Sequence, residues 1–212
     1  MTTHQTESTQ TSRKVTAGVP ERSRDRIMAA ASELAKERGI AGATIARVCQ
    51  RSGLPVSSVY WYFEDKDHLF AEVIRSSVAQ WLVSVPRWDV SADTTIAEGL
   101  RRILGQATTT FAEMPAFLRI GMQVVLETGE QNAKTREAYI DVRDQSRLMI
   151  SAWLRAFLPD DAGADLAEDL ASLVVALADG MIVGSQVYPE WEPGQHVDLL
   201  AGMIAAIADS AR

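Results

Sequence analysis

The chain contains a single cysteine, Cys49, so an internal disulfide cannot form. Its three histidines stand far apart in the sequence, and none has metal-site spacing to Cys49 or to another histidine. The sequence also lacks a phosphate loop, a dinucleotide fingerprint and a nucleophile elbow. These absences argue against an enzyme, and we expect no catalytic residue, no cofactor and no metal.

Long hydrophobic runs are scarce as well. The most apolar stretch, residues 170–187, is interrupted by Asp179 and Gln186, whereas a membrane span requires roughly 20 predominantly apolar residues. The first residues are polar as far as Lys14 and contain no apolar segment typical of a signal peptide. We therefore expect a cytoplasmic protein without a membrane partner, in which residues 170–187 form a buried helix.

Charge is distributed unevenly along the chain, whose formal net charge is -7. Up to Phe63 there are nine lysines and arginines against five acidic residues, a balance of +4 that leaves -11 for the remainder. A basic head on an acidic body is expected when one end of a protein meets phosphate. Chance variation would produce the same imbalance, so charge alone does not decide the function.

Apolar residues recur at helical spacing through most of the chain, and no strand pattern or internal repeat interrupts them. Residues 1–20 show no such period and are predicted to be a disordered tail. Glycines and prolines separate the periodic segments, and the predicted fold class is all-α. Helices are predicted at about 22–38, 44–52, 56–63, from 66 to before Pro86, and at 94–114, 115–127, 133–158, 164–187 and 194–211.

Two short predicted helices joined by the Gly53-Leu54-Pro55 turn form a helix-turn-helix, whose second helix fits the major groove of DNA. In that second helix Val59 and Phe63 stand four residues apart and anchor one face to the core. The aromatic run 60–62 lies largely outside this stripe, and the small hydroxyls of Ser57-Ser58 permit close approach to the groove. On the pattern alone, a short amphipathic helix whose aromatics pack on a neighbouring element remains the alternative.

Residues 44–70 resemble the DNA-binding domain of the TetR family of bacterial regulators. Thr44-Ile45 matches the start of the family's second helix, Val48-Cys49 its usual Ile-Ala pair, and Gly53-Leu54 its Gly-Val turn. Residues 59–63, Val-Tyr-Trp-Tyr-Phe, match the Leu-Tyr-x-His/Tyr-Phe recognition segment. Lys66 matches the lysine that opens the fourth helix, with Leu69 in register. Because Cys49 stands where the family places a small buried alanine, we interpret it as an inert hydrophobe rather than a redox sensor.

The resemblance implies a DNA-binding domain at residues 21–68 that carries the helix-turn-helix, and a larger helical ligand-binding and dimerisation domain at residues 69–212. It implies a homodimeric transcriptional regulator, most often a repressor, that binds a palindromic operator in double-stranded DNA and is released by a small, largely apolar effector. The residues implied to contact DNA are Thr44, Arg47, Pro55, Val56, Ser57, Ser58, Tyr60, Trp61, Tyr62 and Lys66.

Within that set, the resemblance assigns phosphate contacts to Thr44, Tyr60 and Lys66, and base-edge contacts to residues 56–58 and Trp61. This sequence departs from the family at two positions. Val56 stands where a lysine is frequent, and Ala46 stands where an arginine is frequent. We expect Arg47, Gln50 or Arg51 to compensate for the missing phosphate contacts. If they do not, the chain is a helical interaction or ligand-binding protein without DNA function, which is the alternative interpretation.

Dimerisation is predicted on the last two helices, where small residues allow close helix approach. In proteins of the TetR type, the corresponding helix pair forms a four-helix interface. A purely intramolecular core is the alternative interpretation of the same apolar residues. The predicted interface residues are Val174, Leu177, Gly180, Met181, Gly184, Leu200, Met203, Ile204 and Ile207.

The middle helices combine methionine with aromatic residues, which fill a core or line an adaptable apolar pocket. The resemblance favours the pocket. Asp179 has apolar sequence neighbours and needs a partner, either a ligand or an arginine such as Arg143, Arg147 or Arg155, and we favour the ion pair. The predicted ligand-binding residues are Phe111, Met114, Phe117, Leu118, Met122, Gln123, Met149, Trp153 and Asp179.

Overall fold

The computed structural model describes residues 18–90, 95–110, 114–127, 131–159, 163–188 and 190–211. In these ranges the chain forms helices and connecting loops, without a strand, so the all-α prediction is confirmed. The helices are α1 (Gly18–Gly42), α2 (Ile45–Ser52), α3 (Val56–Tyr62), α4 (Lys66–Ser84), α5 (Ile96–Thr109), α6 (Ala116–Leu126), α7 (Ala133–Arg155), α8 (Gly163–Val187) and α9 (Gly194–Asp209).

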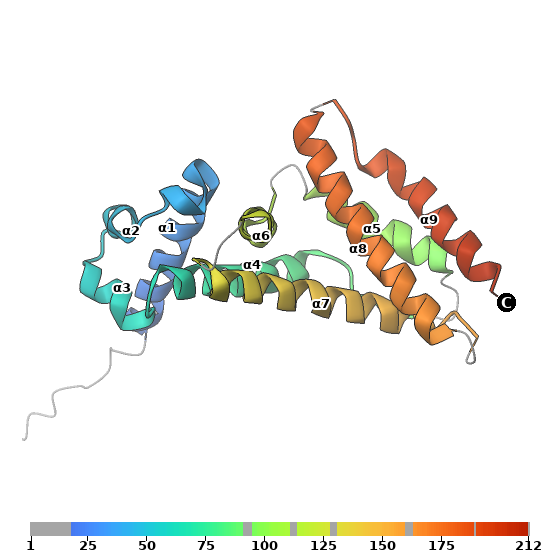
Figure 1. Ribbon diagram of the computed structural model, residues 1–212, viewed down its shortest axis with the longest axis horizontal. Helices are drawn as coiled ribbons and strands as arrows, with labels where there is room; N and C mark the ends of the chain where they lie inside the picture. The colour runs from blue at the N-terminus through green and yellow to red at the C-terminus, as the bar shows by residue number, and fades with distance from the viewer. Residues whose placement is uncertain are drawn as a thin grey trace, which may run out of the picture.

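The helices are arranged along one long axis (Figure 1). The three-helix unit α1–α3 occupies one end, and α5, α8 and α9 occupy the other. Between them α4 and α7 run side by side, and α6 crosses close to α1 and α4. Because α4 starts at the three-helix unit and reaches the middle of the molecule, it connects that unit to the C-terminal part.

The N-terminal boundary differs slightly from the prediction. Helix α1 begins at Gly18, so residues 18–20 of the expected tail are helical, while residues 1–17 of that tail lie outside the described residues. Pro20 does not prevent this early start, because a proline in the first turn lacks only an N–H that has no partner inside the helix. At the other end of the helix, Gly39 adopts a φ of 69° that interrupts the helical geometry, as its glycine predicts.

The helix-turn-helix is formed by local capping and by burial of one side of each helix. The Thr44 hydroxyl accepts a hydrogen bond from the Arg47 N–H and caps α2. Gly53, at a φ of 65°, ends α2 in the left-handed conformation that lets the chain turn sharply. Val48 of α2 and Val59 of α3 are fully buried, so both short helices are anchored to the same core.

Helix α8 differs from the buried helix that its composition predicts. By length and composition it is the one described helix that could cross a membrane, yet it packs against α7 in this fold. Its inner face is buried at Leu170, Val174 and Ile182, whereas Leu177 and Val183 are exposed. Helix α8 is apolar around most of its circumference, and only one side of it meets the core of its own protomer.

Candidate DNA-binding surface and ligand cavity

The exposed surface of α3 carries the side chains that the sequence predicts for DNA contact. Trp61 is 81% exposed, and Tyr60 and Val56 are more than half exposed. On the opposite side of the helix, Val59 and Phe63 are buried. The alternative in which all three aromatics pack on a neighbour therefore fails for Tyr60 and Trp61. Large apolar side chains held away from the core are a surface that a partner can cover.

Near α3, some of the side chains expected to contact DNA are exposed, whereas Arg51 is bound within the protein. Thr44 and Arg47 of the α2 start are exposed, as is Gln50. Arg51 instead forms an ion pair with Glu37 of α1, at 2.5 and 2.8 Å between the guanidinium and carboxylate atoms. The hydrogen bond from Arg51 lowers the pKa of Glu37. Of the three residues expected to compensate for the missing cations, Arg51 is thus already engaged within the protein.

Lys66 and Tyr62 lie at the edge of the same surface and are half-buried. Lys66 is the first residue of α4, and its Nζ lies 5.8 Å from the centre of the Phe70 ring. Burial lowers the pKa of Lys66, while the charge of Glu127 opposes that shift. The ring of Tyr62 lies 6.3 Å from that of Phe63, which agrees with a supporting role for Tyr62. The remaining predicted contacts, Pro55, Ser57 and Ser58, lie at the start of α3, with Ser58 partly buried.

A carboxylate of α4 caps the start of α7 and so joins these two helices close to the three-helix unit. Asp67 accepts hydrogen bonds from the backbone N–H of Lys134 at 2.8 Å and from that of Thr135 at 2.9 Å. It also accepts one from the Thr135 hydroxyl at 2.6 Å, and Thr135 is fully buried. The residue before α7, Asn132, makes no side-chain cap of its own. The first N–H groups of α7 therefore depend on a side chain from another helix.

Lys134 reinforces this junction from the solvent side. Its Nζ lies 2.7 Å from a Glu64 carboxylate oxygen and 3.0 Å from one of Asp65. The hydrogen bond from Lys134 lowers the pKa of Glu64, and the backbone hydrogen bond of His68 is the larger cause of the lowered pKa of Asp65. Because Glu64 and Asp65 directly follow α3 in the sequence, these contacts tie α7 to the end of the predicted recognition helix.

A cavity of about 660 Å³ lies in the C-terminal part, between α4, α5, α6, α7 and α8. Most of its wall is apolar, and its size is within the range of small-molecule sites. Of the predicted ligand residues, Phe117, Leu118 and Met149 line it. Phe111 lies outside the described residues. Within the residues that the structure describes, no group of histidine, cysteine and carboxylate side chains is arranged to hold a metal ion.

Five predicted ligand residues do not line this cavity. Met114 lines a different hollow, and Met122 is partly buried against the core. Gln123 accepts a hydrogen bond from the Ile40 N–H at 3.3 Å, so it joins α6 to α1 instead. Trp153 is buried and donates a hydrogen bond to the Asp89 carbonyl. Asp179 is paired with an arginine, described below. Helical spacing identified these residues as inward-facing but not which interior space they face.

Many residues that line this cavity were not predicted from the sequence. Trp81 and Leu82 come from the end of α4, and residues 85–88 come from the loop that follows it. Val174, predicted at the dimer interface, also lines the cavity. The apolar residues of the loop after α4 were the available signal for this part of the wall. Val85, Pro86 and Trp88 stand close together there, and large apolar side chains favour burial over exposure to solvent.

Asp179 forms an ion pair with Arg143, as the sequence favours. A carboxylate oxygen of Asp179 lies 2.5 Å from Nη2 of Arg143. The same Nη2 group donates a longer hydrogen bond, of 3.4 Å, to the Val175 carbonyl. Burial raises the pKa of Asp179, although the charge and hydrogen bond of Arg143 counteract the rise. Burial also raises the pKa of the neighbouring Tyr139 to about 12. Arg143 lines the cavity, whereas Asp179 does not.

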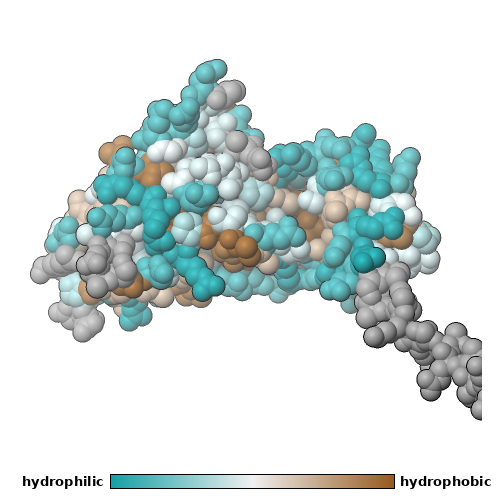
Figure 2. Space-filling view, turned by 180° about the vertical axis from the view of Figure 1, so that it is seen from behind, coloured by the Kyte–Doolittle hydropathy of each residue, from teal (hydrophilic) through white to brown (hydrophobic). Residues whose placement is uncertain are grey.

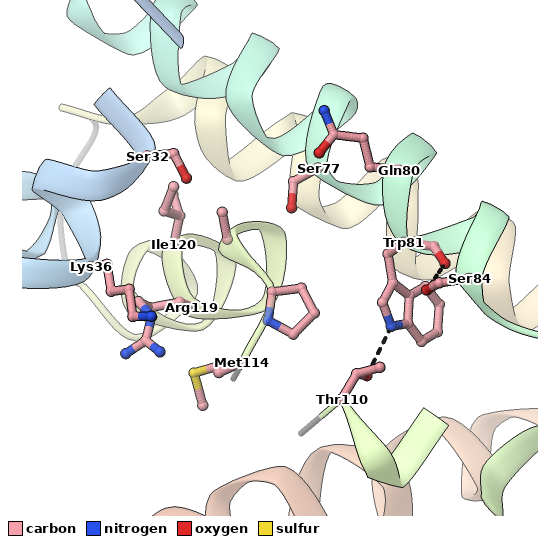
Figure 3. Close-up of a pocket in the computed structure, with 12 residues that line it drawn as sticks. Ser32, Lys36, Ser77, Gln80, Trp81, Ser84, Thr110, Met114, Arg119 and Ile120 are labelled. Carbon is pink, nitrogen blue, oxygen red and sulfur yellow. Dashed lines mark hydrogen bonds between the residues drawn. The ribbon is translucent and has the colours of Figure 1, made fainter. Parts of the chain in front are cut away.

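A second hollow, of about 420 Å³, lies between α1, α4 and α6 (Figure 3). Ser32 and Lys36 of α1 and Arg119 of α6 surround it, and Trp81 of α4 closes one side. Trp81 donates a hydrogen bond to the Thr110 hydroxyl at 3.1 Å. Trp81 also lines the larger cavity, so one side chain contacts both spaces.

The predicted dimer interface divides into two groups. Val174, Met181, Leu200 and Ile204 are buried within the protomer, where they pack in its own core. Gly184 is covered by its own chain, since a Cβ there would press on the Trp191 ring. The residues that remain exposed are Leu177, Gly180, Met203 and Ile207.

Further exposed apolar residues extend these positions into one stripe on each helix. On α8, Leu173 precedes Leu177 by four residues, and on α9, Leu199 precedes Met203 by four. Figure 2 shows apolar patches that interrupt the polar surface over the half of the molecule away from the three-helix unit. The outward sides of α8 and α9 are therefore candidates for association.

Comparisons with known proteins agree with this arrangement. Residues 27–73 match the family described as bacterial regulatory proteins, tetR family. No curated protein matches the chain. Among solved structures, a transcriptional regulator from Rhodococcus sp. RHA1 is 25% identical with a TM-score of 0.68, over 88% of this chain and 97% of that chain.

Two more distant solved structures share the fold. NalD from Pseudomonas aeruginosa, the secondary repressor of the MexAB-OprM multidrug efflux pump, is 18% identical with a TM-score of 0.62, over 87% of this chain and 96% of its own. FadR from Bacillus subtilis, a transcriptional regulator solved in complex with stearoyl-CoA, is 12% identical with a TM-score of 0.65, over 86% of this chain and 97% of its own.

The cap on α7 leads to a stability prediction. Replacing Asp67 with alanine leaves three donors at the start of α7 without their acceptor, one of them on the buried Thr135. We expect Asp67→Ala to lower the free energy of unfolding by about 1–3 kcal/mol, measured by urea unfolding followed by circular dichroism. Asp141→Ala, on the exposed side of the same helix, should change it by less than about 0.5 kcal/mol. Equal effects of the two substitutions would contradict a capping role.

Proposed function

This chain carries the DNA-binding domain of the TetR family of bacterial transcriptional regulators, and from that premise we propose that it is a ligand-responsive repressor. It binds a palindromic operator in double-stranded DNA as a homodimer. It is released when a small, largely apolar effector enters the cavity between α4 and α8. It acts in the cytoplasm, without a membrane partner and without catalysing a reaction.

The observation that carries this proposal is the division of α3 into a buried and an exposed side. Val59 and Phe63 fix the helix to the core, while Tyr60 and Trp61 extend into solvent. A rigid helix with exposed aromatic and hydroxyl side chains can enter the major groove, where base edges differ in their donor and acceptor patterns. Packing within the protomer does not explain why a tryptophan stands exposed at position 61, whereas contact with DNA would explain it.

The exposed stripes of α8 and α9 support the homodimer. A single recognition helix reads few base pairs, whereas a two-fold dimer places two of them about 34 Å apart in successive major grooves. Helices α8 and α9, which carry Leu177 and Met203, lie at the end of the molecule away from the three-helix unit (Figure 1). Association through them leaves both copies of α3 accessible to DNA.

The cavity supports an apolar effector, since apolar side chains form most of its wall. The structurally similar FadR was solved in complex with stearoyl-CoA, and the structurally similar NalD is a repressor. These two neighbours favour ligand binding and repression for this chain as well. An effector in the cavity touches α4 at Trp81 and α6 at Phe117, whose rings lie 5.5 Å apart. Because α4 begins at Lys66 beside α3, a shift of α4 moves the recognition helix and changes the spacing between the two copies.

The DNA-binding surface leads to the first functional prediction, measured on an operator selected from a random DNA pool at near-physiological salt. Trp61→Ala should weaken operator binding by about 1–3 kcal/mol and relax the preference at one base position. Tyr60→Ala and Lys66→Ala should weaken binding to all sequences about equally, and Lys66→Ala should reduce the salt dependence by about one charge. None of the three should unfold the dimer.

The matched control is Arg101→Ala. It also removes one cation, but from an exposed ion pair with Asp198 on α9, at the end of the molecule opposite α3. Its operator affinity should equal that of the unmodified protein. If folded, dimeric protein enriches no DNA, and the α3 and α4 variants behave like the control, the chain is an interaction or ligand-binding protein without DNA function.

Dimerisation is tested by placing a charge on the exposed stripe of α8. Leu177→Glu should convert the dimer to monomers, because a carboxylate cannot be buried at an apolar interface without a partner. Light scattering after size exclusion measures the mass directly. Leu126→Glu changes an even more exposed leucine of α6, 83% exposed, and should leave the dimer intact. Dimers in both variants would exclude the α8 stripe as the interface.

Effector and operator binding should be coupled. An apolar molecule that binds in the cavity should weaken operator binding by a certain factor. The operator should weaken binding of that molecule by the same factor, because both effects reflect one coupling free energy. Calorimetric titrations of the effector with and without the operator measure that factor. Independent binding of the two would show that the cavity does not control DNA release.

A further inference from the structure

The wall of the ligand cavity carries charge of one sign. Among its described residues the only charged side chains are Arg87 and Arg143, and no acidic side chain lines it. The rest of the wall is largely apolar, including Trp88 and Met149. A cationic group beside apolar side chains favours a ligand that has an anionic end and an apolar body.

Arg143 retains hydrogen-bond donors for such a ligand. Its hydrogen bonds to Asp179 and to the Val175 carbonyl both use the Nη2 group. Among the residues that the structure describes, none accepts a hydrogen bond from its Nε or Nη1. A guanidinium presents five N–H donors in a planar fork that binds a carboxylate through two parallel hydrogen bonds. The single contact with Asp179 leaves that capacity partly unused.

The position of Asp179 explains how the charge of Arg143 is compensated in the protein without a ligand. The side chain of Arg143 is 20% exposed and that of Asp179 33% exposed, so this pair is shielded from bulk water. An unpaired arginine there would be costly, and Asp179 compensates its charge from behind the wall. A ligand carboxylate that enters through the cavity meets Arg143 first, because Asp179 does not line the cavity.

We propose that the effector is an amphipathic carboxylate, with an aliphatic or aromatic body in the apolar part of the cavity and its carboxylate bound to Arg143. Asp179 holds Arg143 in place in the free protein and competes with the ligand carboxylate for the guanidinium. This inference rests on the proposed function, because it assumes that the cavity between α4 and α8 is the effector site.

The test compares ligands that differ only in their polar end. Decanoate, 1-decanol and decylamine form one series, and 4-phenylbutanoate, 4-phenylbutanol and 4-phenylbutylamine form a second. Binding is measured without DNA by tryptophan fluorescence, since Trp81 and Trp88 line the cavity, and by calorimetry. We expect the carboxylate to bind between about ten- and a hundredfold more tightly than the alcohol in at least one series, with the amine weakest.

Substitutions assign that preference to one side chain. Arg143→Gln should abolish the advantage of the acid over the alcohol, and Asp179→Asn should increase it by removing the competing charge. Arg147→Gln is the matched control on the same helix, because Arg147 is paired with Asp144 and Glu168 outside the cavity wall. If Arg143→Gln does not fold, the double variant Arg143→Gln/Asp179→Asn removes both charges of the pair together.

The outcomes are distinguishable. Equal binding of acid and alcohol, or an acid preference that survives in the Arg143 variants, would overturn the carboxylate inference and leave the proposed apolar effector site standing. Binding of no compound from either series would overturn both the cavity as effector site and the inference. Operator selection is measured separately, so failure to bind DNA would contradict the proposed repressor without affecting the result at Arg143.

Discussion

The cap that Asp67 places on α7 joins α4 to α7 at the point where both helices leave the three-helix unit. A helix begins with N–H groups that have no partner within the helix, and α7 has no side-chain cap at Asn132. Asp67 supplies the acceptor from the first turn of α4, directly after the recognition helix. The pairing fixes where α7 starts relative to α4, and both helices then form walls of the ligand cavity. This polar contact thus lies between α3 and the cavity, at the junction of two helices that contribute to the cavity wall.

The link from cavity to recognition helix is short because α4 takes part in both. Its first turn carries Lys66 and Asp67 beside the three-helix unit, and its last turns place Trp81 in the cavity wall. Helix α6 lies against the same face, where the Phe117 N–H donates a hydrogen bond to the Ser77 hydroxyl at 3.1 Å. A single helix therefore extends from beside the three-helix unit to the cavity wall, and the proposed ligand response would act through it directly.

The sequence was sufficient for the helices and for the division of α3 into a buried and an exposed side, because both depend on local rules. Thr44 caps α2 and Gly53 ends it, as their residue types predict, and the four-residue spacing of Val59 and Phe63 identified the buried side of α3 correctly. These features are set by neighbours within a few residues. The comparison with TetR-type regulators then agreed with the family that residues 44–70 resemble.

The cavity and the association surface could not be assigned in the same way. Leu177 and Met181 belong to one apolar helix, yet the first is exposed and the second is buried. A helix that is apolar around most of its circumference does not indicate which side meets its own core. Gln123 likewise has the composition of a ligand contact, but its partner is the Ile40 backbone, 83 residues away. Only the tertiary arrangement decides between these possibilities.

If the exposed aromatic side chains of α3 bind DNA as proposed, they have a consequence for how the protein finds its site. Attraction to any DNA comes from cations near phosphates, and here Val56 replaces a frequent lysine, Arg51 is held by Glu37, and the chain after Phe63 carries a balance of -11. Tyr60 and Trp61 contribute only at contact distance. We expect brief residence on unrelated DNA and little sliding along it, so the search proceeds mainly by repeated encounters from solution, and the cell must supply enough copies to keep the operator occupied.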